Sequence, residues 1–157
     1  MKKLLTTILF AGSCLLGGVA AQADKSGGTL SFLVQPEPLT LASYVSTSGP
    51  IGLVMPKVYE GLFDYDNDGK MVPILAESYD MSADGKTVTF KLRKGVKWHD
   101  GKPFTSADVK FTIMDVLKKV HPRGPNSFRE VSSIDTPDAH TAVFNLKKPA
   151  PYMMRSF

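Results

Sequence analysis

Three histidines, His99, His121 and His140, are the side chains best suited to bind a metal or move a proton. A helical zinc site typically uses ligands four positions apart, and none of the three has a partner at that spacing. All three also fall in predicted turns or loops. The sequence therefore predicts no metal site, and we expect no cofactor.

The alternation of Asp64, Asp66 and Asp68 before Gly69 resembles the start of a calcium-binding loop. A loop of that type needs a glutamate at its twelfth position, and the twelfth position counted from Asp64 is Leu75. Aspartate and asparagine also bond to their own backbone in turns, where glycine supplies a positive φ. This pattern therefore predicts a solvated turn.

Enzyme motifs are absent from the sequence. There is neither the Gly-x-Ser-x-Gly turn of serine hydrolases nor a phosphate-binding loop of the Walker type. Asp84-Gly85 and Asp100-Gly101 are typical turn pairs. Trp98, the one tryptophan, is predicted to be a core or half-buried anchor beside a hairpin, in preference to a ligand-stacking residue. We expect a protein that is not an enzyme and has no catalytic residue.

The first residues have the pattern of a secretory signal peptide over 1–23. Lys2 and Lys3 precede an uncharged run over 4–20 and a small-x-small triplet at 21–23. A membrane-spanning helix is the alternative. The run is at the short end of the roughly 17–25 residues that such a helix needs, and its glycines weaken it further. We therefore expect cleavage after the triplet, and export.

A lipid anchor is a second alternative, because Cys14 follows small residues. Lipoprotein signals usually have leucine where Ala11 stands, so cleavage further on is favoured. The mature chain 24–157 then has no cysteine and forms no disulfide. Removing Lys2 and Lys3 from the 19 basic residues leaves 17 against 15 acidic ones, a net charge of +2. That balance does not predict binding to nucleic acid.

One hairpin is the clearest predicted element. Val88, Phe90 and Leu92 alternate with polar residues, which predicts a strand over 87–92 with one buried face. A strand over 76–81 precedes it through the turn at 82–85, and an Asp-Gly pair between two such runs favours a hairpin. Another turn is expected at 99–101.

A helix comes after the hairpin. Thr105 is a good N-cap, and Asp108 favours the positive end of the helix. Pro122 and Gly124 end it. The apolar residues at helical spacing, which we expect to form one buried stripe, are Val109, Ile113, Val116, Leu117 and Val120.

The remaining elements are less regular. They comprise a strand over 29–34, a loop over 39–50, a short helix over 51–59, a strand over 62–65, and strands over 131–134 and 142–146 around a turn at 136–138. Hairpins combined with one strong helix favour the α+β class.

Several blocks of the sequence resemble family 5 extracytoplasmic solute-binding proteins, the dipeptide, oligopeptide and nickel receptors of ABC importers. The longest joins AESY at 76–79 to DGKTVTFKLRKGVKWHDGKPFTSADV at 84–109, with turn, strand, tryptophan and helix cap in the family's order. The others are QPEPLT at 35–40, VYEGL at 58–62, and DTPD at 135–138 with FNLKKP at 144–149. They span essentially the whole mature chain.

The resemblance implies part of a bilobal periplasmic-binding-protein fold of cluster C, with a mixed sheet, hairpins and one long amphipathic helix. Family members are far longer. Residues 24–157 would therefore hold the start of the first lobe and most of an added small domain, as an N-terminal fragment truncated before the cleft is complete. Such a fragment would expose apolar surface and tend to aggregate.

By the same resemblance, the protein is a periplasmic, monomeric receptor that closes over a peptide or peptide-like solute and delivers it to an ABC permease in the inner membrane. Peptide-binding members hold the ligand backbone by strand-like hydrogen bonds. The implied ligand-binding residues form two segments: Gln35, Pro36, Glu37 and Pro38, then His121, Arg123, Asn126 and Phe128.

Two alternatives remain open. Within the family, the solute is nickel, heme or another small molecule. Outside it, the chain is an independent secreted α+β module that works as an interaction domain or a small enzyme. Turn-forming, solvated and core roles compete with a ligand-binding role at each implied residue, so we expect the two segments to be better identified than their members.

Overall fold

The computed structural model describes residues 27–157. The chain divides into a first unit that ends at Phe32 and a second from Leu33 to Phe157, which holds all the described helices and strands. The predicted signal peptide, with Cys14, lies outside the described residues. No described helix combines the length and the hydropathy needed to cross a bilayer.

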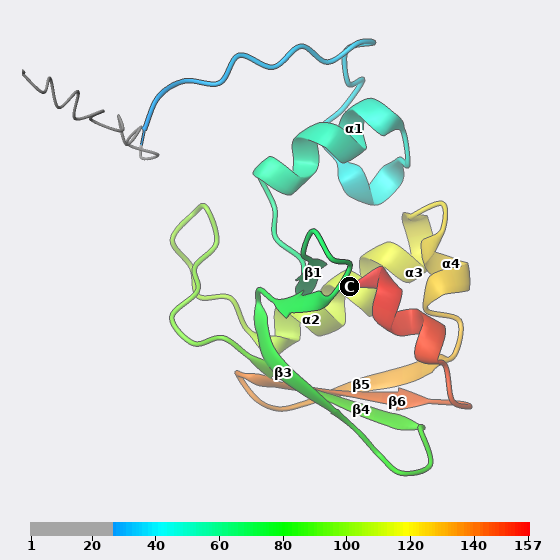
Figure 1. Ribbon diagram of the computed structural model, residues 1–157. Coiled ribbons are helices and arrows are strands. Elements are labelled where there is room, and N and C mark those ends of the chain that lie inside the picture. The colour runs from blue at the N-terminus through cyan, green and yellow to red at the C-terminus, as the bar shows by residue number, and fades with distance from the viewer. Residues whose placement is uncertain (1–26) are drawn as a thin grey trace, which may run out of the picture. The chain divides into compact units, whose positions relative to one another are not determined.

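A four-stranded sheet is the centre of the second unit (Figure 1). Its strand order is β3–β4–β6–β5, and every pair is antiparallel, where the resemblance implied a mixed sheet. Hairpins join β3 to β4 and β5 to β6, and β4 pairs with β6 at the middle. The strands are β3 (Ala76–Met81), β4 (Thr87–Leu92), β5 (Val131–Asp138) and β6 (Thr141–Leu146).

The β3–β4 hairpin has the predicted bounds, because its turn is determined locally. The Ser82 hydroxyl donates to Asp84 Oδ1 at 2.6 Å, and the same carboxylate oxygen accepts from the Lys86 amide at 3.0 Å. Gly85 takes a φ of +66°, which L side chains rarely adopt. Donation from Ser82, and then from Lys86, lowers the pKa of Asp84 below its ordinary value.

Helices cover one face of the sheet (Figure 1). Thr105 caps the first as predicted: its amide donates to Asp108 Oδ2 at 2.7 Å, which completes a capping box. The middle of the predicted helix is a π-helix, in which the backbone bonds span five residues. The segments are α2 (Ser106–Phe111), the π-helix η3 (Thr112–Leu117), α3 (Lys118–Val120) and α4 (Gly124–Ser127).

Aromatic rings fill the core between the sheet and its cover. Phe90 and Phe144 meet edge to face with centroids 4.9 Å apart. Phe157 lies 4.9 Å from Phe90 and 5.5 Å from Phe144. The predicted buried face of β4 is confirmed, since Val88, Phe90 and Leu92 are at most 2% exposed. Burial of these rings is the main term that holds the sheet to its cover.

Short elements precede the sheet and come after it. β1 and β2 form a small antiparallel pair closed by the predicted turn, where the Asp66 carboxylate accepts from the amides of Asp68 and Lys70. The segments are η1 (Ser43–Val45), α1 (Gly49–Val54), η2 (Met55–Lys57), β1 (Phe63–Tyr65), β2 (Met71–Pro73) and η4 (Pro151–Ser156).

The structure corrects two expectations and adds three elements. Residues 29–34 are irregular and not a strand, because none of the described strands pairs with them. The expected turn at 136–138 is the end of β5; the chain reverses at Ala139-His140 instead, and a register shift between Asp135 and Asp138 accommodates Pro137. β2, α4 and η4 were not predicted.

Candidate functional site

A groove of about 770 Å³ runs along the helix that begins at Ser106. We call it the helix groove. One wall is the apolar face of α2 and η3, and the other is the chain between η1 and β1. The residues that line it are Ser43, Tyr44, Tyr59, Glu60, Gly61, Leu62, Leu75, Trp98, Phe104, Val109, Phe111, Thr112, Ile113, Val116, Leu117, His121, Ser156 and Phe157.

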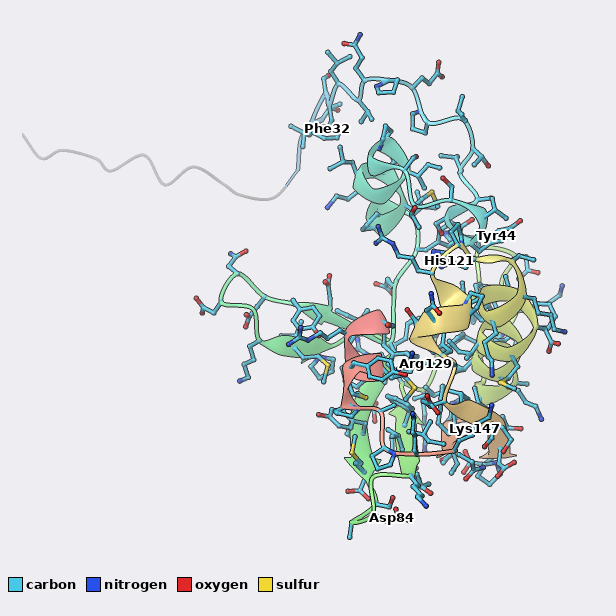
Figure 2. The ribbon with its side chains drawn as sticks, turned by 90° about the vertical axis from the view of Figure 1, so that its right-hand side faces the viewer. Phe32, Tyr44, Asp84, His121, Arg129 and Lys147 are labelled. Carbon is cyan, nitrogen blue, oxygen red and sulfur yellow. The ribbon has the colours of Figure 1, made fainter. Side chains whose placement is uncertain are left out.

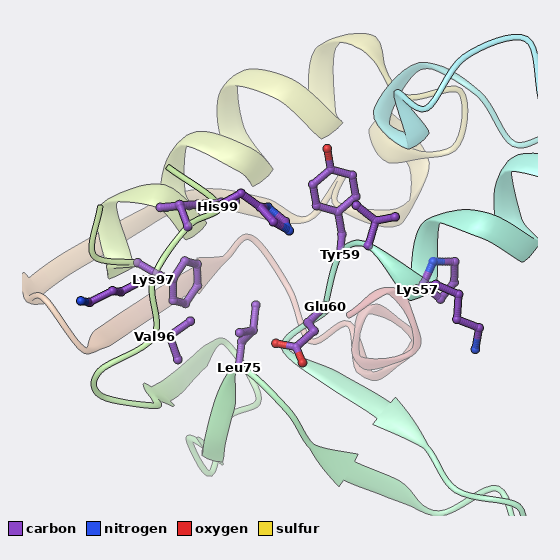
Figure 3. A pocket seen from close by; sticks show the side chains of 11 residues that line it. Lys57, Tyr59, Glu60, Leu75, Val96, Lys97 and His99 are labelled. Carbon is purple, nitrogen blue, oxygen red and sulfur yellow. The ribbon is translucent and has the colours of Figure 1, made fainter. Parts of the chain in front are cut away.

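A second hollow of about 380 Å³ adjoins the helix groove (Figure 3). We call it the Glu60 pocket. The loop over 93–105 supplies one side and the segment after η2 supplies the other. Its lining residues are Pro56, Lys57, Val58, Tyr59, Glu60, Leu75, Val96, Lys97, Trp98, His99 and Phe104. Tyr59, Glu60, Leu75, Trp98 and Phe104 line both hollows, so the two are continuous.

The loop that holds Trp98 is fixed by its own hydrogen bonds. The Trp98 amide donates to the Lys102 carbonyl at 2.8 Å, and the Gly101 amide donates back to the Trp98 carbonyl at 2.9 Å. This is the turn predicted at 99–101. Trp98 was predicted to be a core or half-buried anchor; the structure leaves the residue 40% exposed, and its ring meets that of Phe104 edge to face with the centroids 5.7 Å apart.

The second predicted segment lies where α3 ends. His121 lines the helix groove, and the Arg123 amide donates to its Nδ1 at 3.1 Å. Partial burial, and then the charge of Arg123, lowers the pKa of His121 below its ordinary value. Figure 2 shows His121 and Tyr44 near each other in this view, and both line the groove.

Asn126 and Phe128 have different surroundings. Asn126 is exposed on α4. Phe128 is only 2% exposed, and its ring lies 5.7 Å from that of Phe157 in the core. Its side chain therefore packs inside the fold, and only its backbone is near the surface segment.

The first predicted segment lies apart from both hollows. Gln35, Pro36 and Glu37 are exposed in irregular chain, Pro38 is half-buried, and none of the four lines the helix groove or the Glu60 pocket. Of the eight predicted residues, His121 alone lines a described hollow.

Several groove residues were not singled out from sequence. Tyr44 lies in the one-turn helix η1, and Tyr59 and Glu60 come just after η2, so no periodic pattern marks any of the three. The VYEGL block was the one signal that contained two of them. Within residues 27–157 no cluster of side chains suits a metal ion.

Comparison with known proteins defines the class of the chain. Residues 70–157 match the model of the family described as bacterial extracellular solute-binding proteins, family 5 Middle. The chain belongs to this family, whose members are solute-binding transport proteins and not an enzyme class. The resemblance found in the sequence and the α+β class are thereby confirmed.

Particular relatives share part of their length with the chain. "Putative ABC transporter peptide-binding protein BOV_A0352" of Brucella ovis is 41% identical over 157 residues, which is 96% of this chain and 28% of the relative. Haemophilus influenzae OppA, solved with the peptide RPPGFSPFR, is 28% identical with a TM-score of 0.65, over 75% of this chain and 26% of that one. NikZ from Campylobacter jejuni, solved with Ni(L-His), is 31% identical with a TM-score of 0.59, over 63% and 20%.

Proposed function

We propose that the chain is part of the solute-binding component of an ABC importer that takes up peptides or peptide-like solutes. The observation that carries this proposal is the 41% identity to the Brucella relative along 96% of the chain, because that relative is named as a peptide-binding protein. The family is one of binding proteins, so the chain has no catalytic role in this proposal.

The proposed binding surface has two parts. One is the segment from His121 to Phe128, because His121 lines one end of the helix groove. The other is the segment 35–38, exposed except at Pro38, in which the backbone carbonyls and the amides of Gln35 and Glu37 are the groups that can bond to an extended ligand backbone. In this proposal residues 24–157 form the N-terminal portion of a two-lobed protein. The partner that receives the solute is an ABC permease, and the protein works as a monomer in the periplasm after removal of residues 1–23.

A chimera tests the function and the surface together. Residues 24–157 replace the matching portion of the Brucella relative, and isothermal titration measures binding of a mixture of short peptides. We expect saturable binding that weakens when His121→Ala and Asn126→Ala are combined. Ser132→Ala, on the exposed surface of β5, is the matched control. A folded chimera that binds no peptide would reject the peptide proposal, and unchanged affinity in the double variant would reject the surface.

A second candidate solute is a nickel complex, because NikZ was solved with Ni(L-His). The same chimera is titrated with nickel and L-histidine. The higher identity to the relative named as a peptide-binding protein favours the peptide. Binding of the nickel complex without binding of peptides would reverse that order.

A further inference from the structure

The Glu60 pocket has a composition that the proposed function does not use. Two edge-to-face aromatic pairs border it: Tyr59 with His99 at 5.9 Å, and Trp98 with Phe104 at 5.7 Å. The Glu60 carboxylate lies in the same hollow. In Figure 3 this carboxylate and the His99 ring point into the pocket from opposite sides.

The carboxylate of Glu60 has no partner within the described part of the chain. Neither the ion pairs nor the side-chain hydrogen bonds of residues 27–157 include it. Two lysines border the pocket, yet Figure 3 shows Lys57 and Lys97 directed away from it. Neither Lys57 nor Lys97 pairs with the Glu60 carboxylate. This carboxylate, which lies beside aromatic rings, is therefore free to pair with a cation from outside.

We propose that the Glu60 pocket binds a small organic cation, of the alkylammonium or alkylguanidinium type. Aromatic rings attract such cations through their negative faces. A carboxylate adds a direct charge interaction at one end. The apolar floor of Leu75 and Val96 suits the alkyl part, and a volume of about 380 Å³ is sufficient for such a group.

This site does not depend on which solute the importer carries. It lies on the 93–105 loop and on η2 with the segment after it, whereas the residues of the proposed solute surface lie on 35–38 and after α3. A basic side chain of a larger ligand and a free amine present the same chemistry to it. The two sources are separated by titrating a free cation first.

The single tryptophan reports on this pocket directly, because Trp98 lines it. The full chain is titrated with ethylguanidinium and with tetramethylammonium while Trp98 fluorescence is recorded. Ethylurea and tert-butanol are the neutral controls of similar shape. We expect saturable changes with both cations, and none with the neutral pair. Equal responses to cations and neutral controls, or no response to any of them, would overturn the proposal.

Variants separate charge from shape. Glu60→Gln keeps the size of the side chain, and we expect it to weaken cation binding about tenfold. Tyr59→Leu removes one ring and should weaken tetramethylammonium about threefold while leaving the pocket charge intact. Glu77→Gln, an exposed carboxylate on β3, is the matched control and should bind like the parent. Unchanged cation affinity in Glu60→Gln, with circular dichroism showing an intact fold, would contradict the assignment.

Discussion

Gly61 is needed because backbone oxygens lie too close to leave room for a Cβ, and not because its φ is positive. A Cβ at this position would collide with a backbone oxygen of Phe157, and it would lie only 3.0 Å from the carbonyl oxygen of Phe63, which is held in β1. Phe157 in turn belongs to the aromatic core with Phe90 and Phe144. A methyl group at Gly61 therefore acts on the core through the backbone.

Gly61→Ala should lower the free energy of unfolding by about 1–3 kcal/mol, the usual cost of an added group in a packed site. Gly52→Ala is the matched control. Gly52 lies in α1 with open space where its Cβ would be, so alanine there should be neutral or slightly stabilising. Urea unfolding monitored by circular dichroism measures both. Equal effects of the two substitutions would mean that the contact with Phe157 is not tight.

Asp84 makes stability depend on pH at the hairpin turn. Its pKa is lowered in the folded chain, first by the Ser82 hydroxyl and then by the Lys86 amide. A carboxyl with a lowered pKa stabilises the fold above its ordinary pKa, and this stabilisation is lost as the pH falls through the folded value. Asp84→Asn should therefore melt below the parent at neutral pH, with a difference that closes in acid.

Thermal melts between neutral pH and strong acid test this expectation. Asp80→Asn, an exposed position on β3 without a side-chain hydrogen bond to a described residue, is the control and should show no such closing. A gap between Asp84→Asn and the parent that is constant with pH would assign the effect to turn geometry instead of charge.

Side-chain hydrogen bonds could be predicted from the sequence where the donor and the acceptor are only a few positions apart. The turn at Asp84-Gly85 and the cap at Thr105 with Asp108 need only near neighbours, and both are as predicted. The Glu60 pocket could not be predicted in this way. Glu60 and His99 are brought together by tertiary packing, and neither lies in a periodic pattern.

At the scale of elements, the long helix shows where the spacing of apolar residues no longer predicts which side chains are buried. The predicted stripe assumed an α-helix throughout, and Val109 and Ile113 are buried as expected, at 4% and 5% exposed. The π-helix then adds a residue to the turn and shifts the phase of the residues beyond it. Val120, the last member of the stripe, is 52% exposed as a result.

Two alanine substitutions in this helix should differ sharply. Ile113→Ala removes buried methyl groups and should cost about 2–5 kcal/mol. Val120→Ala should change stability by no more than about 0.5 kcal/mol, because its side chain is largely in water. Chemical unfolding of the two variants measures the difference. A large loss from Val120→Ala would show that the helix is α-helical to its end in solution.

Strand prediction succeeded or failed according to pairing. In the β3–β4 hairpin each strand pairs with the one next to it in the sequence, so the local residues are enough to predict it. Residues 29–34 have strand-like composition, but strands need a neighbour, and none of the described strands supplies one. Pro137 suggested a turn, whereas a register shift lets an edge strand keep it.

At the scale of the whole molecule, several large apolar side chains of the described residues are exposed. Leu39 is fully exposed, and Leu33 and Phe111 are 87% and 60% exposed. The wall of the helix groove adds to this surface. Where exposed apolar side chains gather into patches, such surfaces typically pack against another structure or aggregate.

The purified chain should therefore bind an apolar dye and increase in light scattering as its concentration rises. Sucrose, which favours burial, should increase the association, and arginine should reduce it. Light scattering and dye fluorescence across a dilution series are the measurements. A sharp, cooperative melt of a monomer at high concentration would count against this expectation.

The order of strands also has a kinetic consequence. The two hairpins, β3–β4 and β5–β6, join neighbours in the chain, and such units form in roughly 1–10 μs. The central pairing of β4 with β6 joins Lys91 to Thr141, fifty positions apart, and the helical segment has to be accommodated between them. The chain loses conformational entropy when that long loop closes, and this loss comes before the Phe90–Phe144 contact can stabilise the pairing. We therefore expect the docking of two preformed hairpins to be the slow step in folding, so substitutions at Phe90 should slow refolding more than substitutions at the hairpin turns do.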